Sequence, residues 1–279
     1  MMQMELDIIY NQDCIEGMKE LPDESVDLIV TDCPYKIIAG GVTIEQRKDE
    51  VSGIFQKRAI SDGSKLGNKW LKKNADDIPC AVRKGKMFEH NDVTFSAWLP
   101  EVFRVLKNGC HCYIMINGRN LKDLQVEAEN VGFQFVNLLA WKKNNLTPNK
   151  YYMQQMEFIL LLRKGKARNI NNMGTSNCLE IPNIIGKKRH PTEKPVELMK
   201  IFIENSSDEG DIVLDPFFGS GSTLIACVQS KRKYLGYELD PSYFDIACLR
   251  LDEAERERTQ TIICIVLIIT MKGVKLYDK

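Results

Sequence analysis

Four consecutive residues suited to binding an amino group follow a short apolar stretch near the start of the chain. The stretch is VDLIVT (26–31), and the tetrapeptide after it is Asp32-Cys33-Pro34-Tyr35. The Asp32 carboxylate and the backbone carbonyl of Cys33 can each accept a hydrogen bond, and the Tyr35 ring offers a face on which a base can stack. Pro34 stiffens the turn. An ordinary Asp-Pro turn is the alternative interpretation, but this chemistry favours a site that holds the amino group of a nucleobase.

A glycine-containing turn later in the chain is typical of a nucleoside site. The apolar residues 212–214 lead into Asp215, and Gly219 and Gly221 follow in the sequence DPFFGSGS. Glycines let the backbone approach a ligand closely. The spacing matches neither the dinucleotide GxGxxG fingerprint nor a GK[ST] phosphate loop. Glu238 ends the next apolar stretch, where an acid can accept hydrogen bonds from ribose hydroxyls. These features predict a nucleoside ligand without a pyrophosphate.

Segments whose apolar pattern is typical of strands alternate along the chain with segments whose pattern is typical of helices. The apolar runs predict strands at 6–10, 26–31, 111–116, 133–141, 156–162, 212–215 and 233–239. Apolar residues at helical spacing, or a residue type that often begins a helix, predict helices at 14–21, 95–106, 195–205, 222–229 and from 241 onward. Asn108-Gly109 is expected to end the second of these helices. This alternation predicts an α/β fold, a doubly wound and mostly parallel sheet. Ligands bind at the carboxyl ends of such strands, which is where both motifs lie.

The motifs and their order resemble those of the DNA amino-methyltransferases, in the group whose catalytic motif precedes the cofactor motif. The tetrapeptide resembles their [DNS]-P-P-[YFW] loop, and residues 215–221 resemble their DPFxGSG loop. His190-Pro191-Thr192-Glu193-Lys194-Pro195 resembles their HPTxKP element, and 11–14 resembles their N-terminal G-D-C segment. The resemblance covers residues 7–35, 92–162 and 188–255. It implies the doubly wound sheet of S-adenosylmethionine-dependent methyltransferases.

The resemblance also implies a role for each matched residue. Asp32, the carbonyl of Cys33, Pro34 and Tyr35 would hold the target amine. The methionine part of S-adenosylmethionine, the methyl donor, would be cradled by Asp215, Pro216, Phe217, Gly219, Ser220 and Gly221. Glu238 would bind the ribose, Asp13 would lie near the adenine, and Thr192 and Lys194 would close the cofactor pocket. Asp at the first position of the tetrapeptide favours the N6 amine of adenine in a flipped-out base, and Ser would have favoured N4 of cytosine.

Cys33 departs from the family pattern, which has proline at this position. The change affects the rigidity of the loop but leaves the carbonyl acceptor in place. A cysteine nucleophile of the kind used in C5 methylation of cytosine is disfavoured, because those enzymes carry Pro then Cys and this chain has Cys then Pro. The open alternatives are N4-cytosine methylation, methylation of RNA or of a protein amide, and an accessory DNA-binding protein with a lapsed catalytic site.

Two basic regions separate acidic parts of a chain whose formal net charge is zero. Residues 36–90 form a long, glycine-containing insertion, predicted to be mobile without DNA and to order on it. Residues 163–189 are the expected target-recognition segment, with basic residues as candidate DNA contacts: Arg163, Lys164, Lys166, Arg168, Lys187, Lys188 and Arg189. Trp141 and Lys142-Lys143 are further candidates, although a core position is favoured for Trp141. Double-stranded DNA is thus the expected partner, and a lysine-rich solvated surface is the alternative interpretation.

Composition limits the remaining classes. The nine cysteines form no CxxC pair, so a metal site is not expected and reduced cytoplasmic thiols are. The longest apolar run, 262–271, is too short to span a membrane. We expect a methyltransferase domain over 1–260 and a tail over 261–279 that forms an extra edge strand or is dispensable. A homodimer and a partner restriction nuclease are associations that the resemblance allows.

Overall fold

The structure is a computed structural model that describes residues 5–34, 93–147, 151–184 and 193–274, the last fourteen of these by their backbone only. By internal contacts the chain divides into two units, one made of Met1–Cys33 and Thr94–Lys279 and the other of Pro34–Val93. The insertion predicted at 36–90 lies outside the described residues and stays a prediction. All elements named below belong to the first unit.

The described residues form one eight-stranded sheet in the order β1-β8-β7-β2-β3-β5-β4-β6. The strands are β1 (Ile8–Tyr10), β2 (Val26–Asp32), β3 (Leu106–Ile116), β4 (Gln134–Thr147), β5 (Gln154–Arg163), β6 (Cys178–Glu180), β7 (Ile212–Asp215) and β8 (Lys233–Tyr237). β5 runs antiparallel to both β3 and β4, and every other pairing is parallel. The predicted mostly parallel α/β sheet is confirmed.

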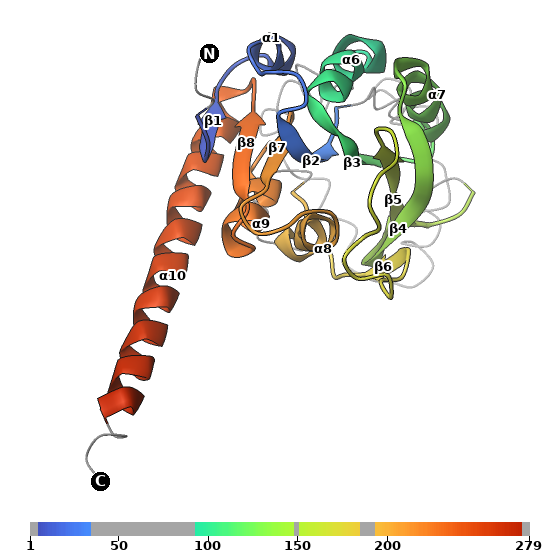
Figure 1. The fold of residues 1–279 in the computed structure, drawn as a ribbon. Helices are drawn as coiled ribbons and strands as arrows, with labels where there is room; N and C mark the ends of the chain where they lie inside the picture. Colours follow the sequence, from blue (N-terminus) through green and yellow to red (C-terminus); the bar gives the residue numbers. More distant parts are fainter. Residues whose placement is uncertain (1–4, 35–92, 148–150, 185–192, 275–279) are drawn as a thin grey trace, which may run out of the picture. The chain divides into compact units, whose positions relative to one another are not determined.

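Helices cover both faces of this sheet, as a doubly wound fold requires. They are α1 (Cys14–Lys19), α6 (Phe95–Val105), α7 (Leu121–Val131), α8 (Val196–Ser206), α9 (Ser222–Gln229) and α10 (Pro241–Val274). Figure 1 shows α1, α6 and α7 along one face, with α8 and α9 along the other. The helices bury apolar side chains, such as Trp98 of α6, Leu124 of α7 and Phe202 of α8, which removes that surface from water and drives the packing.

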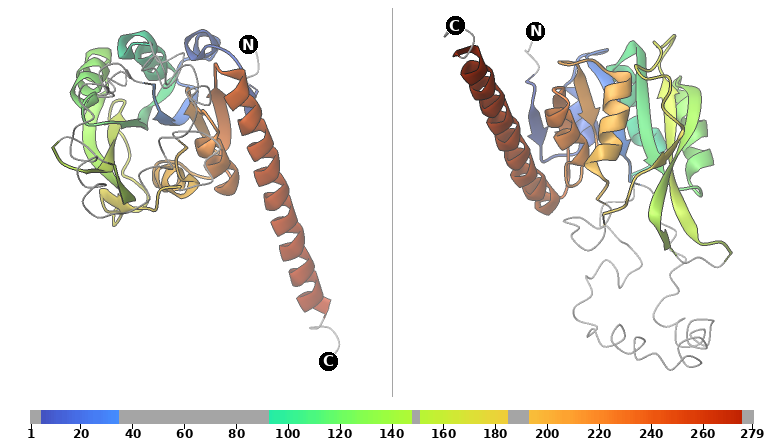
Figure 2. Two further views of the ribbon diagram at one scale, coloured as in Figure 1. Left: turned by 180° about the vertical axis from the view of Figure 1, so that it is seen from behind. Right: turned by 90° about the horizontal axis from the view of Figure 1, so that it is seen from below.

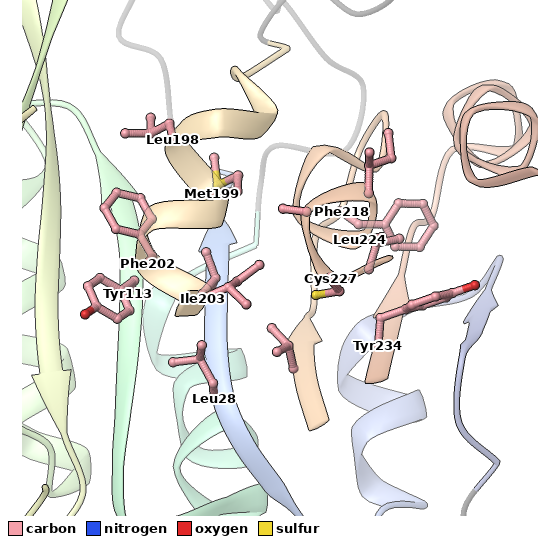
Figure 3. Packing of buried hydrophobic residues seen from close by; sticks show 14 of the residues in the cluster. Leu28, Tyr113, Leu198, Met199, Phe202, Ile203, Phe218, Leu224, Cys227 and Tyr234 are labelled. Atoms are coloured by element: carbon pink, nitrogen blue, oxygen red, sulfur yellow. The ribbon is translucent and has the colours of Figure 1, made fainter. Parts of the chain in front are cut away.

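A large hydrophobic cluster lies between α8, α9 and the central strands. Phe202 of α8 stacks on Tyr113 of β3 with ring centroids 4.9 Å apart, and the Tyr113 hydroxyl forms a 2.7 Å hydrogen bond with that of Ser206. Ile203 and Leu28 are fully buried in the same cluster, as Figure 3 shows. A buried tyrosine needs such a partner for its hydroxyl. This packing fixes α8, and with it the segment just before α8, against the carboxyl half of the sheet.

Three elements of the structure differ from what the sequence led us to expect. The helix from Phe95 ends at Val105 and passes directly into β3, which contains the Asn108-Gly109 turn signal. Gly109 has φ +86° within that strand, and its N–H donates to the Lys164 carbonyl, so the signal marks an irregularity in the strand. Helix α7 and strand β6 were not predicted: Leu121, Leu124, Ala128 and Val131 give α7 a helical spacing that was overlooked between many polar residues, and β6 is only three residues long.

The expectation of an edge strand at residues 261–279 is wrong for the described part of this tail. The backbone of α10 continues as one helix from Pro241 to Val274, across the boundary expected at 260. An apolar run of this length is ambiguous between strand and helix, and here the preceding helix extends through it. In the described portion of the chain, no helix combines the length and apolar character needed to cross a membrane.

The hairpin formed by β4 and β5 extends beyond the carboxyl end of β3. The last residue of β3, Ile116, pairs with Phe158 of β5, while β5 begins at Gln154. Residues 141–147 of β4 and 154–157 of β5 therefore pair with one another past the end of β3. Figure 2 (right) shows these strands running on past their neighbours. The extension begins at the edge of the sheet where Asp32 lies, because Asp32 pairs with Met115 of β3.

Glycine 236 is a position where the fold leaves no room for a side chain. A Cβ there would lie 2.6 Å from the ring of Phe218 and 3.2 Å from the carbonyl oxygen of Asp215. We predict that Gly236→Ala lowers the free energy of unfolding by about 1–3 kcal/mol, because Phe218 must move. Denaturant unfolding measures this. Gly174→Ala, at an exposed site, is the control and should change stability by less than about 0.5 kcal/mol. Equal stabilities for the two variants would contradict this packing.

Candidate active site

The two motifs lie on neighbouring strands at one edge of the sheet. β2 pairs in parallel with β7, so Asp32 and Asp215 both end their strands at the carboxyl edge. The hydroxyl of Thr31 donates a 2.7 Å hydrogen bond to Asp215 Oδ1, and both side chains are buried. This contact ties the strand end that carries the tetrapeptide to the start of the glycine turn. It confirms that the chain brings the two motifs together.

The Asp215 carboxylate organises the turn that follows it. Besides the bond from Thr31, Asp215 Oδ1 accepts a 3.1 Å hydrogen bond from the N–H of Phe217. Gly219 and Gly221 then adopt left-handed backbone conformations, with φ +54° and +82°, which residues with a Cβ rarely adopt. α9 begins directly after Gly221, so the N–H groups of its first turn face this edge. The geometry is that of a tight cradle for a ligand at a strand end.

Glu238 holds the other side of this cradle. Its two carboxylate oxygens accept hydrogen bonds from the N–H groups of Gly219 (3.0 Å) and Asp240 (2.8 Å). Burial raises the pKa of Glu238, although both hydrogen bonds oppose that rise. Each oxygen retains acceptor capacity for a further hydroxyl group. A half-buried acid already fixed in this way is suited to bind a ribose.

The N-terminal segment reaches the same place through Asn11. Its side-chain amide donates to the backbone carbonyls of Glu238 (2.8 Å) and Leu239 (3.2 Å). Asp13 is the N-cap of α1, where its Oδ1 accepts from the N–H groups of Ile15 and Glu16. One Asp13 oxygen is therefore engaged in capping the helix. The role predicted for Asp13 beside an adenine stays a proposal.

Phe217 and Ser220 of the glycine turn are each anchored by a residue that sequence reasoning missed. The ring of Phe217 meets that of buried Trp98 of α6 edge to face, with centroids 5.2 Å apart. Arg250 of α10 donates to the carbonyl and hydroxyl oxygens of Ser220, at 2.5 and 2.9 Å. Arg250 also lies 3.0 Å from Glu193, and both side chains are less than a tenth exposed. The turn is thereby joined to the segment that precedes α8.

The next residue in that segment, Lys194, forms an ion pair with Asp32. Lys194 Nζ lies 2.5 Å from Asp32 Oδ2 and 3.4 Å from Glu157 Oε2, and its side chain is 8% exposed. Lys194 therefore contacts the predicted catalytic carboxylate directly. The closing of the cofactor pocket by Lys194 stays a prediction. Burial raises the pKa of Asp32, Lys194 opposes the rise and Glu157 adds to it. Glu157, an acid inside an apolar strand, is the sequence signal that could have revealed this cluster.

The thiol of Cys33 points away from this chemistry. Cys33 is 2% exposed, and its Sγ lies 3.7 Å from the carbonyl oxygen of Met115. Burial raises the pKa of this thiol well above its ordinary value, and the charge of Asp32 adds to the rise. A thiolate nucleophile needs the opposite environment. Pro34 ends the described stretch, while Tyr35 and Thr192 lie outside the described residues, so their roles stay predictions.

Several residues predicted as DNA contacts have structural partners instead. Lys164 Nζ donates to the carbonyls of Phe103 (2.9 Å) and Leu106 (2.7 Å) at the end of α6, so the prediction for Lys164 is wrong. Trp141 is buried and its indole N–H donates to Ile181, as its favoured core position requires. Lys143 pairs with Glu157 at 2.7 Å.

The start of the expected recognition segment lies away from the edge of the sheet that carries Asp32. It therefore does not form one DNA-facing surface with Asp32. Arg163 ends β5 and pairs with His111 in the middle of β3, whereas Asp32 pairs with Met115 near the carboxyl end of β3. The chain returns to the carboxyl edge only at 178–184, where the N–H of Asn183 donates to Asn144 of β4. Lys187, Lys188 and Arg189 lie outside the described residues. The described part of 163–189 thus contributes to the active-site edge only through its second half.

Comparison with known proteins gives consistent matches over most of the chain. A family model described as DNA methylase matches residues 26–248. The type II methyltransferase M.HinfI of Haemophilus influenzae is 28% identical over 271 residues, which cover 89% of this chain and 69% of that protein. The type II methyltransferase M2.DpnII of Streptococcus pneumoniae is 28% identical over 269 residues, covering 90% and 91% of the two chains.

Solved structures match at the level of the whole fold. The crystal structure of the M1.HpyAVI–SAM complex has a TM-score of 0.59 at 25% identity, covering 87% of this chain and 98% of that chain. The cytosine-N4-specific PvuII DNA methyltransferase also has a TM-score of 0.59, covering 90% of this chain and 91% of that chain. Its identity is 16%, so the likeness to that enzyme shows the fold alone.

The buried carboxyl group of Asp215 predicts a pH dependence of stability. Burial raises its pKa to about 6 in the folded protein, against opposing hydrogen bonds from Thr223, Thr31 and Phe217. Its pKa in the unfolded chain is about 3.9. The folded state therefore binds the proton more tightly, so this group stabilises the fold at low pH and the contribution is lost as pH rises from about 4 to about 6. A difference of this size corresponds to on the order of 3 kcal/mol.

The variant Asp215→Asn should lack this dependence, because an amide does not titrate. We predict that its free energy of unfolding, relative to that of the unchanged protein, rises by on the order of 3 kcal/mol between pH 4 and pH 6.5. Denaturant unfolding at a series of pH values measures both curves. Two curves that stay parallel over this range would show that Asp215 titrates as an exposed aspartate does.

Proposed function

Because the chain belongs to the N6/N4 DNA methylase family, we propose that it transfers a methyl group from S-adenosylmethionine to the N6 amine of adenine in DNA. The observation that carries this proposal is the position of Asp32. Its carboxylate stands at the carboxyl end of β2, directly beside the strand that leads into the glycine turn. A nucleoside ligand in that turn and an amine on Asp32 would therefore be neighbours.

The residues of the cradle fit S-adenosylmethionine. A Cβ at Gly221 would lie 3.2 Å from Ala247 of α10, and its left-handed backbone also favours glycine, so the turn packs closely against that helix. Glu238 would accept hydrogen bonds from the ribose, and the segment around Asp13 would lie at the adenine end. When bound, S-adenosylmethionine supplies a methyl group on a sulfonium, which is already an activated leaving group. Asp215 would act indirectly, by holding the N–H of Phe217 in place.

The task left to the protein is to position and polarise the amine. The lone pair of an exocyclic base amine is delocalised into the ring, so the amine is a poor nucleophile. The Asp32 carboxylate and the Cys33 carbonyl would accept its two hydrogens and orient the lone pair toward the methyl group. Tyr35 would stack on the extruded base, which compensates for part of the cost of removing the base from the duplex.

Two features support the choice of base and of nucleic acid. Asp at the first position of the tetrapeptide favours adenine N6 through the resemblance of this motif, and N4 of cytosine is the alternative. The type II methyltransferases among the relatives favour DNA over RNA or protein, and a site-specific enzyme with or without a partner nuclease. The intact Asp32, Asp215 and Glu238 contacts support an active enzyme over one with a lapsed site.

The extended β4–β5 hairpin is the described surface that we propose faces DNA. It begins at the edge that carries Asp32, and large side chains near its far end are strongly exposed: Leu146, Tyr151, Tyr152, Met153 and Met156. Exposed aromatic side chains can stack on bases or wedge between them. The basic insertion at 36–90 and the second half of the 163–189 segment are proposed as further DNA contacts.

The catalytic assignment predicts opposite results for two adjacent residues. Asp32→Ala should abolish methyl transfer, because the acceptor of the amine is lost. Cofactor affinity should stay nearly unchanged, because Glu238 and Arg250 still hold the glycine turn. Cys33→Ser should retain most activity, because only the backbone carbonyl of residue 33 is proposed to act. Methylation assays with nucleoside mass spectrometry measure both, and N6-methyladenine is the expected product.

Other products would reject specific parts of this assignment. N4-methylcytosine would show that the choice of base is wrong. An inactive Cys33→Ser variant, an active Asp32→Ala variant and C5-methylcytosine as product would together replace this chemistry with a thiolate mechanism.

The ribose assignment predicts a change in cofactor affinity. Glu238→Ala removes an acceptor from the ribose and the anchor of the Gly219 N–H, so the free energy of cofactor binding should weaken by about 1.5–3 kcal/mol. Isothermal calorimetry measures this. Glu209→Ala, which removes an acid of an exposed ion pair with Lys231, is the control and should bind normally. Unchanged affinity in a folded Glu238→Ala variant would remove the ribose role.

A further inference from the structure

An acidic residue with no role in the proposed chemistry stands beside the catalytic carboxylate. Glu157 lies on β5, one position beyond the last pairing of that strand with β3. It is preceded and followed by apolar residues in MEFILLL, and its side chain is 26% exposed. A carboxylate removed this far from water is costly unless it is paired.

Glu157 belongs to a row of four side chains with alternating charge. Lys143 Nζ lies 2.7 Å from Glu157 Oε1, and Lys194 Nζ lies 3.4 Å from Glu157 Oε2. Lys194 Nζ is also 2.5 Å from Asp32 Oδ2, at the other end of the row. Lys194 therefore lies between two carboxylates, closer to Asp32 than to Glu157.

This arrangement creates a competition that the proposed chemistry must resolve. An ammonium group donates strong, charge-assisted hydrogen bonds to a carboxylate. While Lys194 holds Asp32, the carboxylate is a weaker acceptor for the hydrogens of a neutral amine. A second anion on the far side of Lys194 offers the ammonium another partner at little displacement.

We infer that Glu157 is a positioning residue for the proposed methyl transfer, because it draws Lys194 away from Asp32 when the target amine binds. In the structure as it stands, Lys194 satisfies the Asp32 carboxylate. When a base amine takes over the hydrogen bond at Asp32, Lys194 shifts its main ion pair to Glu157. Asp32 is thereby paired with Lys194 when no substrate is bound, and it is available to accept hydrogen bonds when the amine is bound. This inference rests on the proposed role of Asp32.

The electrostatics of the cluster agree with this division of roles. Burial raises the pKa of Glu157, but Lys194 and Lys143 outweigh it and hold the pKa below its ordinary value, so Glu157 stays an anion. Among the described residues, the charged and titratable groups that act on Asp32 are Lys194 before α8, Glu157 on β5, Asp215 on β7 and the adjacent Cys33, and Lys143 on β4 acts through Glu157.

The first test is the variant Glu157→Gln in the full chain. An amide keeps the size of the side chain but not its charge, so Lys194 should remain on Asp32. We expect kcat for DNA methylation to fall at least tenfold while the Kd for S-adenosylmethionine changes less than twofold. Asp32 must be ionised to accept the amine, so activity is lost as pH falls through its pKa. Removal of the Glu157 charge lowers that pKa and should move the acidic limb of the profile to lower pH.

A second variant and a control separate this role from a structural one. Lys194→Gln removes the opposing charge and should move the acidic limb to higher pH, and it serves as the test if Glu157→Gln does not fold. Asp27→Asn is the matched control, because Asp27 on β2 forms a 2.6 Å, partly buried ion pair with Lys107 at the other end of the strand. It should leave both kcat and the pH profile unchanged.

The outcomes distinguish this inference from the proposed function. If the unchanged protein methylates DNA and Glu157→Gln matches it in kcat and in pH profile, the positioning role of Glu157 is overturned and the function stands. The positioning role would also be overturned if the acidic limb of the pH profile moved in the same direction in Glu157→Gln and in Lys194→Gln. If the unchanged protein methylates no DNA while it binds the cofactor, the proposed function itself fails.

Discussion

A carboxylate withdrawn from water requires a partner, and this requirement governs the edge of the sheet where Asp32 lies. The strand register places Asp32 at the end of β2 and Glu157 beyond the end of β3. Two acids this close would repel each other, and Lys194 between them removes the conflict. The same ion pair anchors the segment before α8 to the sheet. The register thus sets the position of the candidate catalytic group, and the ion pair holds the segment before α8 against it.

The cofactor cradle is linked to this ion pair through a second buried contact. Arg250 of α10 holds Ser220 of the glycine turn and pairs with Glu193, the residue directly before Lys194. Thr31, directly before Asp32, donates to Asp215 at the start of the same turn. The turn and the carboxylate are thus joined on two sides by buried side chains. Preorganisation of this kind is what positioning chemistry needs, since small displacements of reacting groups are costly.

The sequence predicts the fold class and the location of the site well, because both depend on local patterns. Apolar periodicity marked most strands, and the tetrapeptide at 32–35 and the glycine turn marked their carboxyl ends. It did not predict Arg250 or the partner of Lys194, because these contacts join residues far apart in the chain. Lys164 was misassigned for the same reason: its charge suggested DNA, but tertiary packing places it on the carbonyls at the end of α6. The backbone of 261–274 followed the helix before it rather than its own apolar pattern.

The most direct measurement is a crystal structure of the protein with DNA and a non-reactive analogue of S-adenosylmethionine. We expect an extruded adenine whose N6 amine donates to Asp32 and to the carbonyl of Cys33, with Lys194 closer to Glu157 than to Asp32. The analogue should lie against the glycine turn, with its ribose on Glu238. An extruded base whose amine contacts neither Asp32 nor Cys33, with the Lys194–Asp32 ion pair intact, would contradict the account.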